Sequence, residues 1–244
     1  MQTPIVEFKS VSTRFKQFEI LKEISFQMMP GKVHALIGAS GSGKTTILRL
    51  MNGLIRPTSG VVLVDGAPLD YDTIVKLRRT MGYVIQESGL FPHMTVLENI
   101  SLVSKRAGIS ASEIRERAER LMTMVNLPPQ IYFEKRPHQL SGGEKQRIGI
   151  VRSLMLNPKL LLMDEPFGAL DPITRRKIQN EFLSLIDQLK LTVVLVTHDL
   201  REAFKLSHHL ILLHDKQIAQ QGTPNEFLLH PQSKYVNEVI DALS

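Results

Sequence analysis

The chain contains no cysteine among its 244 residues. This absence excludes disulfide bonds and metal sites built on thiolates. The chain also lacks any apolar run approaching the roughly 18 residues expected of a membrane-spanning helix. Its first residues, Met1-Gln2-Thr3-Pro4, do not form the charged-then-apolar pattern of a secretion signal. We therefore expect a cytoplasmic protein.

An excess of one charge sign is small and spread out. The net charge is +6, but the basic residues alternate with 24 acidic ones, as in Glu113-Ile114-Arg115-Glu116-Arg117. That pattern is typical of a solvated helix face, and no nucleic-acid partner is expected. A basic patch beside the inner leaflet of a membrane also fits this charge. We interpret His208, His209 and His214 as solvated loop residues and not as metal ligands.

A glycine-rich segment, Gly38-Ala39-Ser40-Gly41-Ser42-Gly43-Lys44-Thr45, has the spacing of a phosphate-binding loop. Backbone N–H groups must turn inward around the phosphates, and a Cβ would obstruct that conformation. Lys44 can then reach the β- and γ-phosphates, and Thr45 offers a hydroxyl to Mg²⁺. Residues 33–37 resemble a buried strand and residues 47–51 an apolar helix face. This order favours a nucleoside triphosphate site over a glycine-rich turn with a chance lysine.

An acidic pair follows a second apolar run. Leu160-Leu161-Leu162-Met163 is typical of a parallel strand covered on both faces, and Asp164-Glu165 comes directly after it. Catalytic carboxylates belong at the carboxyl end of such a strand. There Asp164 can hold Mg²⁺, and Glu165 can polarise the attacking water as a general base. An isolated pair would instead favour a solvated surface.

Further segments lie in the order found in one protein family. They are Phe15, Gln86 after residues 82–85, Leu140-Ser141-Gly142-Gly143-Glu144, Ala169-Leu170-Asp171 and His198. With the phosphate loop, they make the chain resemble the nucleotide-binding subunit of an ABC transporter over nearly its whole length. In that family the first aromatic stacks on adenine and the glutamine senses Mg²⁺ and water. The later segments match the signature, the D-loop and the switch histidine.

The resemblance implies a complete set of site residues, with ATP and Mg²⁺ as cofactors. The implied catalytic residues are Glu165, His198, Gln86 and Lys44. The implied Mg²⁺ ligands are Thr45, Gln86 and Asp164. The implied nucleotide contacts are Phe15, Gly38, Ser40, Gly41, Ser42, Gly43, Lys44, Thr45, Thr46, Ser141, Gly142, Gly143, Glu144 and Asp171. Glu144 is a departure, because the family more often has glutamine there.

Several of these residues also have plain structural interpretations. Phe15 alone could equally pack in the core or in a turn. A lone histidine is usually a satisfied polar residue, although His198 follows a strand at residues 192–197 that would bring it to the sheet edge of Glu165. Ser141-x-x-Glu144 is a capping box, so it predicts a helix start. A helix start containing two glycines can also direct N–H groups at another molecule's phosphate.

The chain has one phosphate loop and one signature, and in the family these meet in one ATP site from opposite subunits. The resemblance therefore implies a homodimer that holds two ATP molecules. It also implies integral membrane permease subunits, with a solute-binding protein, at the inner face of the plasma membrane. Residues 89–94 would form the docking surface, where Leu90, Phe91 and Met94 are either exposed or packed inside the helical part.

The predicted fold is α/β: a P-loop NTPase core with a mainly parallel sheet flanked by helices, an N-terminal antiparallel β-subdomain and an inserted α-helical subdomain. Residues 1–87 and 158–244 form the core and β-subdomain, and residues 88–157 form the helical subdomain with the signature. Strands are expected at residues 5–11 and 20–26. Helices are expected at 113–125 and from Asp171-Pro172 to about 189. Capping boxes are expected at Thr95 and Ser110, and a cap followed by a first-turn proline at Thr223-Pro224.

Within the family, the segments at residues 164–175 and 222–224 resemble bacterial importers of glycine betaine, choline or related quaternary amines. Those subunits often carry paired regulatory domains, for which we expect no room after Ser244. Amino-acid importers are close competitors. Soluble ABC ATPases of DNA repair, translation or cluster assembly are a different class, but we see no coiled-coil insertion or second cassette here. A nucleotide-gated module without turnover is disfavoured by Glu165 and His198.

Overall fold

The computed structural model describes residues 3–86 and 89–243. The chain divides into two compact units: Met1–Arg78 with Thr192–Ser244, and Arg79–Leu191. The boundary that the sequence predicts between residues 87 and 88 lies outside the described residues. The predicted extent of the helical subdomain therefore stays a prediction.

The first unit opens with an antiparallel sheet. β1 (Val6–Phe15) pairs with β2 (Phe18–Met28), β4 (Ser59–Val64) follows on the other side of β1, and the short β5 (Ala67–Pro68) completes the order β2-β1-β4-β5. Phe8 of β1 stacks on its cross-strand partner Phe26, with ring centroids 4.5 Å apart. The predicted antiparallel β-subdomain is confirmed.

Strands of the first unit also form the parallel part of the fold. β3 (Val33–Gly38) lies between β8 (Thr192–Val196) and β9 (His209–His214) and runs parallel to both, while β10 (Gln217–Gly222) pairs antiparallel with β9. Every residue of β8 is buried. Such continuous burial explains why these strands are apolar runs without the alternation of a half-exposed strand.

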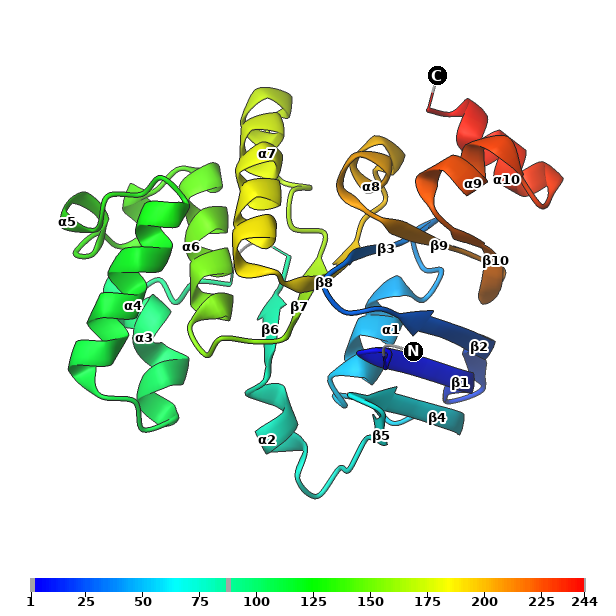
Figure 1. Cartoon of the computed structure of the whole chain (residues 1–244), viewed down its shortest axis with the longest axis horizontal. Helices are drawn as coiled ribbons and strands as arrows, with labels where there is room; N and C mark the ends of the chain where they lie inside the picture. Colours follow the sequence, from blue (N-terminus) through cyan, green and yellow to red (C-terminus); the bar gives the residue numbers. More distant parts are fainter. Residues whose placement is uncertain (1–2, 87–88, 244) are drawn as a thin grey trace. The chain divides into compact units, whose positions relative to one another are not determined.

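Helices cover these strands on both faces (Figure 1). α1 (Lys44–Met51) contacts β3 and β8 on one side and β4 on the other, whereas α8 (Leu200–Leu206) contacts β3. Ala35 and Ile37 of β3 share a core with Phe227 of α9 (Pro224–Leu229) and Val236 of α10 (Lys234–Asp241). The short α2 (Ile74–Arg78) is tied down by Arg78, which donates to the carbonyls of Asn52 and Gly53.

The second unit contains the parallel pair β6 (Met81–Val84) and β7 (Leu160–Asp164) together with a group of helices. Its helices are α3 (Val96–Arg106), α4 (Ala111–Met124), α5 (Pro129–Tyr132), the 3₁₀ turn at Pro137–Gln139, α6 (Gly142–Leu154) and α7 (Pro172–Leu189). Capping boxes begin α3, α4 and α6, because the side chain three residues into each helix bonds back to the cap.

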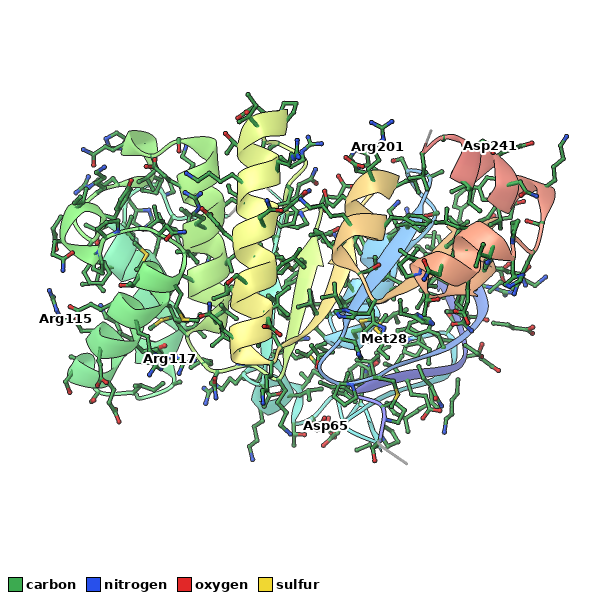
Figure 2. All side chains as sticks on the ribbon, turned by 45° about the horizontal axis from the view of Figure 1, so that its top comes forward. Met28, Asp65, Arg115, Arg117, Arg201 and Asp241 are labelled. Carbon is green, nitrogen blue, oxygen red and sulfur yellow. The ribbon has the colours of Figure 1, made fainter. Side chains whose placement is uncertain are left out.

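Helices α3, α4 and α6 pack on one another. Arg117 of α4 (Figure 2) donates to the carbonyl of Leu154 at 2.8 Å and to Asn157 Oδ1 at 3.3 Å, which satisfies the carboxyl end of α6. Across the described ranges, 3–86 and 89–243, no helix has both the length and the apolar character that a membrane crossing needs.

The interpretation of three histidines as solvated loop residues is wrong for two of them. His209 and His214 are the first and last residues of β9. His209 is half-buried, and its ring centroid lies 5.7 Å from that of His34, which is 2% exposed. The four consecutive apolar residues between the two histidines form a buried strand that the sequence interpretation overlooked.

Candidate functional site

The phosphate loop connects β3 to α1 in the first unit. Its three glycines have positive φ: +145° at Gly38, +79° at Gly41 and +100° at Gly43, which is the N-cap of α1. A Cβ on Gly38 would lie 2.5 Å from the carbonyl oxygen of Leu213, and one on Gly43 would lie 2.6 Å from Leu21 Cδ2. Glycine is therefore required by both conformation and space at those two places, and by conformation alone at Gly41.

Lys44 places a buried positive charge on this loop. The side chain is 6% exposed, and its ammonium donates to the carbonyls of Gly38 and Ala39, each at 2.8 Å. Ser42 Oγ is also buried and has no hydrogen-bond partner among the described residues. An ammonium, an unsatisfied hydroxyl and the N-terminal N–H groups of α1 together form a donor set suited to phosphate oxygens.

The remaining residues of the loop are accessible to different degrees. Ser40 is exposed, whereas Thr45 and Thr46 are half-buried in the first turn of α1. The loop thus confirms the predicted strand, loop and helix order around Lys44. The assignment of individual atoms to phosphates and Mg²⁺ stays a prediction.

The acidic pair lies at the end of β7, in the second unit. Asp164 is the last residue of the strand, and both Asp164 and Glu165 are half-buried. Glu165 has φ +46°, a left-handed conformation that costs a residue with a Cβ roughly 1–2 kcal/mol. Its carbonyl accepts from the N–H of Gly168 at 3.3 Å, which closes the turn after the strand. Strained backbone of this kind concentrates at functional sites.

Gln86 follows β6, and Asp164 ends the neighbouring parallel strand β7. β6 pairs with β7 in parallel register, Val84 opposite Met163, so both side chains leave the same edge of this pair. Gln86 is exposed in the turn after β6. The structure therefore brings together the ends of the strands that carry two of the three predicted Mg²⁺ ligands.

His198 follows β8, beside the strand that carries the phosphate loop. β3 and β8 are parallel, with Leu36 opposite Val196, so the exposed His198 and the loop leave the same edge. The N–H of Asp199 bonds to Thr197 Oγ1 at 3.0 Å, which fixes the backbone after the histidine. His198 and Glu165 belong to different units, and their meeting stays a prediction.

The signature segment begins α6. Ser141 is the N-cap: its Oγ accepts from the N–H of Glu144 at 3.3 Å, and Glu144 Oε2 accepts from the N–H of Ser141 at 2.7 Å. The two glycines differ in role. Gly142 is exposed, but a Cβ on the buried Gly143 would lie 2.8 Å from Thr174 Cγ2 on α7. Ser141 and Gly142 thus form the outward part of the segment, and Gly143 permits close helix packing.

The D-loop aspartate begins α7. Asp171 Oδ1 accepts from the N–H groups of Ile173 at 3.1 Å and Thr174 at 3.0 Å, so it is the predicted N-cap before Pro172. Hydrogen bonds from Thr174, and then from the other N–H groups of this turn, hold the pKa of Asp171 below its usual value. Its carboxylate therefore stays ionised at the start of the helix.

Phe15 is the last residue of β1, which extends beyond the expected end of the strand at residue 11. It is 68% exposed, which excludes the alternative that it packs in the core. Phe18, its cross-strand neighbour, is 73% exposed. The sequence interpretation overlooked Phe18 because an isolated aromatic in a strand carries no signal of its own.

Tyr132 is a second residue that the sequence interpretation overlooked. Its phenolic hydroxyl donates to Glu144 Oε1 at 2.5 Å. The two residues are twelve positions apart, with a 3₁₀ turn between them, so no helical or strand period connects them.

Comparison with known proteins identifies the family of the chain. Residues 21–168 match the model of one protein family, described as ABC transporter. The chain belongs to the ABC transporter family. The matched range includes the phosphate loop, the signature and the acidic pair.

One relative of this ABC transporter chain is considerably longer than the chain itself. The glycine betaine/carnitine/choline transport ATP-binding protein OpuCA of Bacillus subtilis is 46% identical over 220 residues, which are 90% of this chain and 58% of the relative. The chain thus spans less than two thirds of that protein's length.

Two solved structures share the fold. CbiO1 from Clostridium perfringens, part of the ABC transporter complex CbiONQ, superposes with a TM-score of 0.87 at 28% identity, covering 99% of this chain and 95% of its own. The ATP-binding cassette MJ0796, in a dimeric post-hydrolysis state bound to ADP and Pi, gives 0.79 at 35% identity, covering 90% and 98%. The predicted fold class is confirmed.

Proposed function

We propose that the chain is the ATP-hydrolysing subunit of an ABC importer, and that it works as a dimer. The observation that carries this proposal is the phosphate loop. There three left-handed glycines, the buried ammonium of Lys44 and the unsatisfied hydroxyl of Ser42 surround the start of α1. The family match and the cassette MJ0796, which is described as bound to ADP and Pi, support a nucleotide as the ligand.

The residues of the chain divide the reaction among them. Lys44 neutralises charge on the terminal phosphates, and the N–H groups of α1 orient them. Glu165, which has a left-handed backbone in the turn after β7, accepts a proton from the attacking water. His198 donates a hydrogen bond to the terminal phosphate. Phe15 offers an exposed ring on which adenine can stack.

Magnesium would be held by Thr45, Gln86 and Asp164. A hydroxyl, an amide oxygen and a carboxylate are the hard oxygen ligands that this ion prefers. When bound, the ion neutralises negative charge on the phosphates. Asp164 and Gln86 leave one strand edge of the second unit, which supports their sharing one ligand.

Dimerisation follows from the number of sites in one chain. Each chain has one phosphate loop and one signature, and the exposed Ser141 and Gly142 at the start of α6 can face the nucleotide of a second copy. The dimeric description of MJ0796 supports this arrangement. A subunit alone should bind ATP but hydrolyse it slowly.

We propose a quaternary amine, such as glycine betaine or choline, as the imported solute. The support is the relative OpuCA, which is a glycine betaine/carnitine/choline transport ATP-binding protein. Integral membrane permease subunits and a solute-binding protein would complete the importer, with this chain at the inner face of the membrane. Phe91 is 41% exposed and Leu90 and Met94 are half-buried, which supports a small apolar contact with a permease around Phe91.

Purification of the tagged chain from its own membranes tests this function. We expect integral membrane proteins to co-purify with the chain. The complex, reconstituted in liposomes, should then import labelled glycine betaine or choline when ATP is present on the membrane face that carries the chain. The complex carrying Lys44→Ala is the control and should not accumulate solute. Recovery of DNA or ribosomes in place of membrane proteins would reject the transport function, and uptake of amino acids alone would reject the solute class.

A further inference from the structure

The negative charge of Glu144 lies at a place that is unfavourable for binding a nucleotide. It lies in the first turn of α6, where the positive end of the helix dipole and free N–H groups would otherwise attract phosphate. A carboxylate there competes with a phosphate for the same positive field. If mobile, it would also repel the triphosphate bound by a second subunit.

The carboxylate of Glu144 is held by both of its oxygens. Oε2 accepts from the N–H of Ser141 at 2.7 Å, and Oε1 accepts from the hydroxyl of Tyr132 at 2.5 Å. Burial alone would raise the pKa of Glu144, but these bonds and the charge of Lys135 outweigh it and lower the pKa. Glu144 is therefore ionised, directed back at its own helix cap, and charge-assisted in both bonds.

Tyr132 is itself presented on a fixed segment. It ends α5, and the next residue, Phe133, is 4% exposed and accepts from the N–H of Leu97 at 3.1 Å. The carbonyl of Lys135 accepts from the N–H of Val96 at 2.8 Å, and the Lys135 ammonium lies 4.3 Å from the centroid of the Tyr132 ring. These contacts to the start of α3 hold the phenol at the place where it meets Glu144.

We propose that Tyr132 is a positioning residue for the signature: its hydroxyl holds the Glu144 carboxylate against the start of α6 and away from the triphosphate bound by the second subunit. The proposal rests on the proposed function, since it concerns the ATP site of the dimer. It replaces the expectation that Glu144 contacts the nucleotide, and it explains how a glutamate is tolerated where the family more often has glutamine. The exposed Ser141 and Gly142 then remain accessible to the phosphate.

A double-mutant cycle tests this inference. ATP hydrolysis by the purified chain is measured for Tyr132→Phe, Glu144→Gln and the double variant, over a range of ATP and salt concentrations. In the parental background we expect Tyr132→Phe to raise the KM for ATP about tenfold at low salt, because it frees a carboxylate, and less at high salt. In the Glu144→Gln background the same change should alter KM less than about twofold. Tyr235→Phe, which removes a hydroxyl from α10 in the other unit, is the matched control.

The outcomes separate this inference from the function on which it rests. A purely structural hydroxyl would make Tyr132→Phe equally costly in both backgrounds and independent of salt, which would overturn the inference. An active parental chain whose KM is the same with Tyr132→Phe would overturn it as well. A parental chain without ATP hydrolysis would instead overturn the proposed function and the inference with it. Thermal unfolding of the parental chain and all four variants checks that each is folded.

Discussion

Arg147 of α6 forms a close ion pair with Glu181 of α7. Its Nη2 and Nε lie 2.7 and 2.8 Å from Glu181 Oε2, and the side chains are only 12% and 17% exposed. Asn126 donates to the other carboxylate oxygen at 3.2 Å. The ion pair thereby connects α6, which Ser141 caps, to α7, which Asp171 caps. The signature and the D-loop therefore begin two helices that are joined by this ion pair.

Replacing Arg147 with Met should lower the free energy of unfolding by about 2 kcal/mol, because it leaves the largely buried carboxylate of Glu181 without its main partner. Lys234→Met is the matched control. Lys234 lies 3.9 Å from Glu238, with side chains 93% and 61% exposed, and its loss should cost at most a few tenths of a kcal/mol. Urea unfolding measures both. Equal effects of the two substitutions would show that the ion pair between Arg147 and Glu181 does not stabilise the fold.

Acid should destabilise the fold through His34. Burial lowers the pKa of His34 from 6.5 to about 4, against a raising effect of its bond to the carbonyl of Met29. As the pH falls, His34 in the unfolded chain binds a proton before His34 in the folded chain does. The contribution of neutral His34 to the free energy of unfolding is therefore complete above pH 6.5. It falls by roughly 3 kcal/mol in all as the pH drops from there towards 4. Burial also lowers the pKa values of His208 and His209, which adds to the loss.

The free energy of unfolding, measured in urea at several pH values between 7 and 4.5, checks this. In His34→Met the loss across that window should shrink, whatever the stability at pH 7. His138→Gln, at an exposed position of the 3₁₀ turn, should show the loss of the parental chain. An undiminished loss in His34→Met would contradict the assignment.

Lys44→Ala should weaken ATP binding by two orders of magnitude or more, since it removes a buried ammonium that no neighbouring cation of the loop replaces. Isothermal titration with ATP measures the affinity, and Lys177→Ala, an exposed lysine of α7, is the charge-matched control. Unchanged affinity in Lys44→Ala would remove the lysine from the phosphate site.

Glu165→Gln should bind ATP but hydrolyse it at least a hundredfold more slowly, because the amide cannot accept a proton from water. The amide keeps the shape of the side chain, so the left-handed turn after β7 should persist. Phosphate release measures the rate. Parental turnover in this variant would show that another residue is the base.

Much of this fold is local enough to be predicted from the sequence. The capping boxes at Thr95, Ser110 and Thr223 are complete within four residues, and the phosphate loop within eight, so short-range geometry determines them. β9 was not predicted, because the histidines at its two ends, His209 and His214, look like loop residues. Its burial comes from pairing with β3, more than 170 residues away in the chain.

The long-range contacts of the candidate site could not be predicted from the sequence either. Glu181 is 34 residues from Arg147, and Tyr132 reaches Glu144 through an irregular segment. Neither pair lies at a helical or strand period. The sequence therefore suggests candidate residues for the chemistry, but it does not reveal which other side chains position them.

The central claim is that two copies of this chain close around ATP, each signature contacting the nucleotide of the other copy. Sedimentation velocity of Glu165→Gln with and without ATP tests it most directly, compared with Glu165→Gln combined with Ser141→Arg. We expect ATP to convert the first protein to a dimer and to leave the second a monomer that still binds ATP. An ATP-dependent dimer of equal stability in both proteins, or a monomer of full hydrolytic activity, would contradict the account.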